Sequence, residues 1–107
     1  MNHHDETFKQ QRIELHGQSY RDCRFEECEL VFDGDRPPTF QNNQFIDSVF
    51  VFTGAATRTL YLLSNIYHAG DGGQEVIENT FREIREHELH GHEIRTIAPH
   101  TVDHSLG

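Results

Sequence analysis

The sequence predicts a mainly β fold with some α-structure: a short β-solenoid of two to three coils with one or two capping helices. Residues 20–34, YRDCRFEECELVFDG, reappear in outline at residues 40–54, FQNNQFIDSVFVFTG. Within each copy a bulky apolar residue returns every five positions, a period of neither a helix nor a flat strand. Four sides of five residues make one coil of 20, and such coils stack on one another. We therefore expect these stacked pairs: Tyr20 with Phe40, Phe25 with Phe45, and Leu30 with Phe50.

A small or compact polar residue stands two positions before most of the bulky residues, at Cys23, Cys28, Asn43 and Ser48. We interpret these as inward-facing structural positions. The two cysteines are then core residues rather than nucleophiles, because a catalytic thiol needs exposure and a base or positive neighbour. With only two cysteines in the chain, we do not expect a disulfide in a reducing compartment.

The elements are predicted in order along a single domain, residues 1–107. Residues 1–10 show no period and read as a polar arm, and residues 11–54 form the solenoid coils, interrupted by turn residues with Gly and Pro near 33–38. Residues 55–69 place apolar residues at helical spacing and are expected to form a capping helix. Residues 74–97 fit either a third coil or a second helix, and we favour the coil. Residues 98–107 are expected to be a tail.

The pattern of a compact residue, any residue, then Phe or Leu, repeated every five positions, resembles the pentapeptide-repeat proteins over residues 18–54. The resemblance implies a right-handed, four-sided β-helix. Some acidic members of that family are dimers thought to mimic the shape and charge of DNA. Two or three coils at about 4.8 Å each span only a few phosphates, so a single chain can imitate little of a duplex.

The net charge of the chain indicates which kinds of partner it can bind. Nine Lys and Arg against 18 Asp and Glu give a formal net charge of −9. This charge argues against direct binding to nucleic acid or to an anionic membrane surface and favours a protein with a basic surface. The polar start has no signal-peptide pattern, and no apolar stretch is long enough for a membrane span, so we expect a cytoplasmic protein.

The acidic residues of the first repeat are the candidate partner-binding site. Our first hypothesis is a non-enzymatic module, without a cofactor, that docks on the basic surface of another protein, such as one that handles nucleic acid, in the manner of small bacterial or phage inhibitors. A homodimer is expected, through the cap or an open coil end. The acidic residues proposed for docking are Asp22, Glu26, Glu27 and Glu29.

The alternative hypothesis is a metal-binding or metal-dependent protein. Three imidazoles, His87, His90 and His92, lie within six residues of one another and have carboxylates beside them. Imidazole and carboxylate both suit Zn²⁺ or another divalent ion. The spacing does not match the zinc-protease HExxH pattern. The competing interpretation of this segment is a solvated, titrating strip in a chain rich in histidine.

Overall fold

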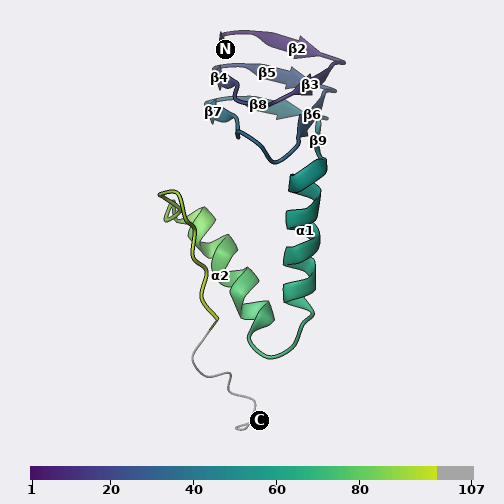
Figure 1. Cartoon of the computed structure of the whole chain (residues 1–107). Coiled ribbons are helices and arrows are strands. Elements are labelled where there is room, and N and C mark those ends of the chain that lie inside the picture. The colour runs from purple at the N-terminus through teal and green to yellow at the C-terminus, as the bar shows by residue number, and fades with distance from the viewer. Residues whose placement is uncertain (99–107) are drawn as a thin grey trace. The chain divides into compact units, whose positions relative to one another are not determined.

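A computed structural model describes residues 1–98, and in that range it contains nine strands and two helices. Figure 1 shows short strands stacked in layers, and the chain then continues into two helices. The elements are β1 (Asn2–His4), β2 (Thr7–Lys9), β3 (Arg12–Glu14), β4 (Ser19–Arg21), β5 (Arg24–Glu26), β6 (Glu29–Phe32), β7 (Thr39–Gln41), β8 (Gln44–Ile46), β9 (Val49–Phe52), α1 (Gly54–Tyr67) and α2 (Gly73–Arg85).

The strands form three parallel, three-stranded sheets, with the orders β1-β4-β7, β2-β5-β8 and β3-β6-β9. Each sheet takes one strand from each of three successive passes of the chain. We call these passes coil 1 (β1–β3), coil 2 (β4–β6) and coil 3 (β7–β9). The coarse prediction of a mainly β fold with helices is thereby confirmed.

The predicted stacking of coil 2 and coil 3 is confirmed residue by residue. Phe25 pairs with Phe45 in the β5–β8 register, and their rings stack with centroids 5.3 Å apart. Tyr20 likewise pairs with Phe40, and Leu30 pairs with Phe50. The five-residue period arises because each of the first two strands of a coil has three residues and is followed by a turn residue in the left-handed region and then by one further residue, which is compact in coils 2 and 3. The turn residues are Asp5, Gln10, Asp22, Glu27, Asn42 and Asp47.

The polar arm predicted for residues 1–10 is wrong, because this segment forms β1 and β2. His3 and Phe8 are the central residues of these strands and pair with Tyr20 and Phe25. The offset from His3 to Tyr20 is 17 residues instead of 20, because β3 and the connection after it are together three residues shorter than β6 and the connection after it. A search at a fixed offset of 20 therefore misses coil 1.

The connections that follow β3 and β6 contain no strand. Residues 15–18 and 33–38 connect the third sheet back to the first as turns and irregular backbone. These connections are nevertheless tied together, since the Leu15 amide donates to the Val31 carbonyl at 2.9 Å and the Gly17 amide donates to the Arg36 carbonyl at 2.9 Å. Hydrogen bonds thus tie the connection after β3 to β6 and to the connection after β6.

The core lies inside coil 2. Its fully buried side chains include Phe25 and both cysteines, which confirms the inward position predicted for the cysteines. Both cysteines are free thiols. The compact polar residues of coil 3 satisfy backbone groups of coil 2, since Asn43 Oδ1 accepts from the Cys23 amide at 2.8 Å and Ser48 Oγ accepts from the Cys28 amide at 3.1 Å.

The helix predicted for residues 55–69 is confirmed as α1; its capping role stays a prediction.

The favoured third coil at residues 74–97 is wrong, because α2 occupies the first half of this range and residues 86–98 contain no strand. The apolar residues of α2 return every three or four positions, which fits a helix. The tail predicted from residue 98 lies, apart from that residue, outside the described residues. Within the described residues, 1–59 and 60–98 form two compact units.

Candidate functional site

A polar depression lies along the sheet formed by β1, β4 and β7. Its volume is about 600 Å³, and all three residues of each strand line it. Three of these residues, His4, Arg21 and Gln41, stand in register in the final position of their strands. The turn residues that follow them in sequence therefore gather at one edge of the depression.

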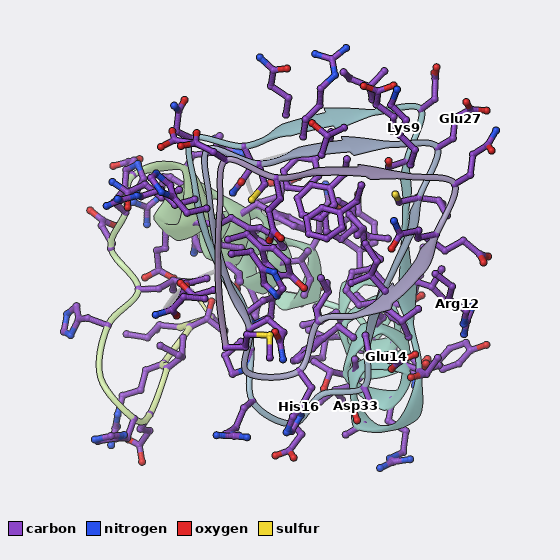
Figure 2. The ribbon with its side chains drawn as sticks, turned by 90° about the horizontal axis from the view of Figure 1, so that it is seen from above. Lys9, Arg12, Glu14, His16, Glu27 and Asp33 are labelled. Atoms are coloured by element: carbon purple, nitrogen blue, oxygen red, sulfur yellow. The ribbon has the colours of Figure 1, made fainter. Side chains whose placement is uncertain are left out.

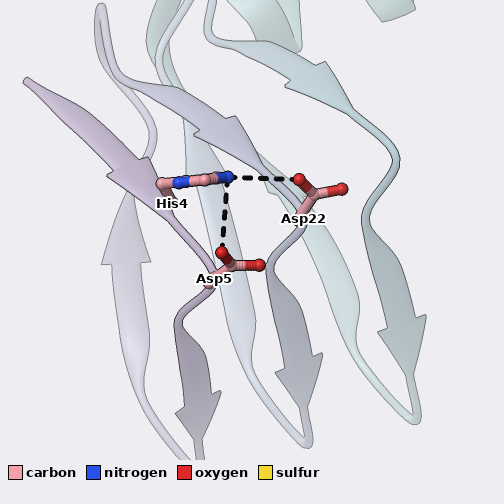
Figure 3. Close-up of side chains that lie close together, drawn as sticks. All are labelled: His4, Asp5 and Asp22. Carbon is pink, nitrogen blue, oxygen red and sulfur yellow. Dashed lines mark hydrogen bonds and ion pairs between the residues drawn. The ribbon is translucent and has the colours of Figure 1, made fainter.

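His4, Asp5 and Asp22 converge at that edge (Figure 3). His4 Nε2 lies 3.3 Å from Asp22 Oδ2 and 3.4 Å from Asp5 Oδ2, and all three side chains are exposed. The backbone explains why they meet. His4 pairs with Arg21 across the sheet, so Asp5 and Asp22 each occupy the left-handed turn position of their coil, both with φ 57°.

Other polar groups hold Asp22 in place. Asn42 Nδ2 donates to Asp22 Oδ1 at 2.6 Å from the same turn of coil 3. This hydrogen bond, with smaller contributions from His4 and Arg21, lowers the pKa of the Asp22 carboxyl below its ordinary value. Arg21 also reaches the cluster, with Nε 3.9 Å from Asp22 Oδ2. Asp22 is therefore a fixed, ionised carboxylate at neutral pH.

The four predicted partner-binding acids are distributed along coil 2: Asp22 follows β4, Glu26 lies in β5, Glu27 follows β5 and Glu29 lies in β6. Asp22 belongs to the cluster just described, Glu26 is ion-paired with Arg24, and Glu29 lies 3.5 Å from Arg12. The hydrogen bond from Arg24 also lowers the pKa of Glu26. Glu27, in the turn between β5 and β6, has no side-chain partner within the described part of the chain. Figure 2 shows it directed away from the coil.

The three imidazoles of the alternative metal hypothesis follow α2, which ends at Arg85. The helix ends before His87, so His87 and His90 do not share a helical face. Within residues 1–98, the side chains that bring three ligand atoms within 4.8 Å of one another are His4, Asp5 and Asp22 instead. Sequence reasoning missed this group because it treated residues 1–10 as an arm. The five-residue spacing of His3, Phe8 and Ile13 was the signal that could have placed it.

The end of coil 3 exposes aromatic side chains that occupy core positions in coil 2. Phe25 is 0% exposed, whereas Phe45, one layer away in the same register, is 41% exposed. The strands of coil 3 are also the edge strands of their sheets. We call this surface the coil-3 end, and it comprises Phe40, Phe45, Phe50 and Phe52.

Comparison with protein-family models, curated proteins and solved structures gives no match to this chain. Among the described residues, neither helix has the length and apolar character needed to cross a bilayer.

Proposed function

We propose that this chain is a non-enzymatic protein-binding module and that its coil-3 end is covered by another polypeptide when it works. The exposure of the coil-3 end carries this proposal. Its aromatic side chains continue the stack of the core by one layer, and large exposed apolar surfaces of this kind are characteristic of interaction sites. Unpaired strand edges beside them offer hydrogen bonds to the same partner.

The occupant that we propose for the coil-3 end is a second copy of this chain. A homodimer buries the same surface on both subunits, so one exposed end is sufficient for a closed assembly. Sedimentation equilibrium over a range of protein concentrations tests this. Phe50→Gln should weaken association at least tenfold, whereas Tyr61→Gln, which removes a 68% exposed aromatic ring from α1, should not. Equal association by Phe50→Gln and the wild-type chain would refute the homodimer, provided that both are equally folded by circular dichroism.

The second part of the proposal concerns a different protein, one with a basic surface, such as a protein that handles nucleic acid. The net charge of −9 and the free carboxylate of Glu27 support this partner class. The other three acids, Asp22, Glu26 and Glu29, contribute charge although each has a neighbouring base. We propose a cytoplasmic setting as well, which agrees with the free thiols of Cys23 and Cys28.

Affinity capture with the tag-free chain on a resin tests the basic partner. A protein retained at about 0.1 M salt and released at about 0.5 M is expected, because salt screens charge contacts. The Glu27→Lys variant should no longer capture that protein. Asp71→Lys makes the same change of charge outside the three coils, between α1 and α2, and this variant should still capture the protein. If Glu27→Lys still captures that protein, or if salt does not release the protein from the wild-type chain, binding through charge contacts is excluded.

We further infer that the three coils form a right-handed β-solenoid of the pentapeptide-repeat type. Three features support this: parallel stacking of successive passes, a period of five residues and a left-handed turn residue after each of the first two strands of a coil. In such a solenoid, the coil-3 end is the last layer of the stack of coils.

A further inference from the structure

We propose that His4, Asp5 and Asp22 form a binding site for a divalent transition-metal cation of the Zn²⁺ type. The site is separate from the coil-3 end and from the His87, His90 and His92 segment. It would join coil 1 to coil 2, because His4 and Asp5 come from the first pass of the chain and Asp22 comes from the second.

The spacing of the donor atoms suits such an ion. Zn–N and Zn–O bonds of about 2.0–2.2 Å in a tetrahedron place neighbouring donors roughly 3.3–3.6 Å apart. His4 Nε2 lies 3.3 Å from the Asp22 carboxylate and 3.4 Å from that of Asp5. A cation can thus be coordinated by all three groups with small rotations of exposed side chains.

The fold presents these donors together without help from an ion. Pairing of His4 with Arg21 sets the register of β1 and β4, and it stacks the two following turn residues, Asp5 and Asp22. Asn42 holds one oxygen of Asp22 at 2.6 Å and leaves the other, Oδ2, toward His4. Because the folded backbone already holds the ligands near one another, metal binding loses less conformational entropy.

The charge at this turn also favours a cation. Stacking places two carboxylates side by side, and like charges in this arrangement repel one another. Arg21 offsets the repulsion in part, with Nε 3.9 Å from Asp22 Oδ2 and Nη2 3.5 Å from His4 Nε2. Arg21 thus competes with the cation, and removing its charge should strengthen metal binding.

Three protein donors leave one tetrahedral position open. This position faces solvent, since all three ligands are exposed, and His4 also lines the polar depression of about 600 Å³. With a cation bound, water would fill the fourth position, and a carboxylate or imidazole of a bound partner could replace it. Imidazole with carboxylates favours Zn²⁺ or Co²⁺ over Mg²⁺ or Ca²⁺, which prefer sites made of oxygen ligands alone.

Calorimetric titration of the full-length, tag-free chain with ZnCl₂ tests the site, and Co²⁺ absorption in the visible range reports its coordination geometry. His4→Gln and Asp22→Asn should each weaken Zn²⁺ binding by at least about tenfold. Asp22→Asn retains the oxygen that accepts from Asn42, so it should remain folded. Arg21→Gln should bind Zn²⁺ several-fold more tightly than the wild-type chain.

Two control variants separate this site from adventitious binding. Asp47→Asn removes an exposed carboxylate from the corresponding type of turn in coil 3, at φ 50°, and should leave the affinity unchanged. The triple variant His87→Gln, His90→Gln, His92→Gln should also leave it unchanged. The proposal is overturned if the wild-type chain binds no Zn²⁺, if His4→Gln binds as tightly as the wild-type chain, or if the triple variant abolishes binding.

Discussion

The side chain of Asn43 accepts a hydrogen bond from the backbone amide of Cys23 at 2.8 Å, across the boundary between coil 3 and coil 2. The same side chain donates from Nδ2 to the Tyr20 carbonyl at 3.1 Å. Ser48 makes the equivalent pair of contacts one side further along, with the Cys28 amide and the Phe25 carbonyl. The compact position of the repeat therefore has a chemical role, because it satisfies backbone groups at the turns where the sheet hydrogen bonds stop.

Asn43→Ala should lower the free energy of unfolding by about 1–3 kcal/mol, because it leaves the Cys23 amide without its side-chain acceptor and removes the Nδ2 donor from the Tyr20 carbonyl. Urea denaturation measures the change. Gln41→Ala, at an exposed position two residues earlier, is the control and should change stability by less than about 0.5 kcal/mol. Equal stability of the two variants would show that the Asn43 contacts contribute nothing.

Phe8→Ala tests whether coil 1 is an integral layer of the fold. Phe8 stacks on Phe25 with ring centroids 5.1 Å apart and packs against the buried cluster. The substitution should cost about 2–4 kcal/mol of unfolding free energy, somewhat less than for a fully buried Phe. Lys9→Ala, on the exposed face of the same strand, should cost little. A change below about 0.5 kcal/mol for Phe8→Ala would restore the interpretation of residues 1–10 as an arm.

Gly34→Ala should be strongly destabilising for steric as well as conformational reasons. Gly34 has φ +94°, and a Cβ there would lie 2.5 Å from the Ala56 amide nitrogen. Gly91→Ala is the matched control, because Gly91 has φ +86° but open space around the added methyl. Gly91→Ala should show only the conformational cost of about 1 kcal/mol, and Gly34→Ala at least twice that. Equal losses in thermal or urea unfolding would show that the close approach at Gly34 is absent in solution.

Acid should remove the contribution of Asp22 to stability. The pKa of Asp22 is lowered in the folded chain from its ordinary value of 3.8, chiefly by Asn42, so the folded state favours the ionised form. The resulting stabilisation is present above pH 3.8 and is lost as the pH falls through the lower, folded pKa. Melting temperatures of the wild-type chain and Asp22→Asn should therefore differ at pH 7 and converge as the pH falls from 3.8 through the lowered pKa of Asp22. A difference that persists unchanged in acid would contradict this account of the Asp22 environment.

Much of the fold follows from the repeat, but two segments do not. The stacking of Phe25 on Phe45 was predicted because both copies keep the same five-residue spacing at an offset of 20. Coil 1 was missed because its loop is shorter and because a polar residue, His3, occupies a core-type position by stacking on Tyr20 at 4.7 Å. At residues 74–97 the Asn79-x-Phe81 spacing imitates the repeat, yet the remaining apolar residues follow the helical period.

The candidate site was less accessible to sequence reasoning than the fold. Asp22 was singled out as acidic, but its neighbours His4 and Asp5 are brought to it by the β1–β4 register, which depends on recognising coil 1. The pairing of Glu26 with Arg24 depends on side chains two residues apart pointing to the same side of a strand. Glu27 remains free because the left-handed turn directs it outward, and that turn is visible only once the strands are placed.

The most direct test of a working surface at the coil-3 end is hydrogen exchange at the Phe40, Phe45 and Phe50 amides. Alternate residues of a parallel strand bond to opposite neighbours. The Gln44 amide donates to the Cys23 carbonyl of coil 2, so the amide of Phe45, the next residue, faces the open edge. NMR exchange rates measured from dilute to concentrated protein report whether a second copy covers this edge. Our account predicts that protection of these three amides rises with concentration. Rapid exchange of all three at concentrations where the chain is associated would contradict it.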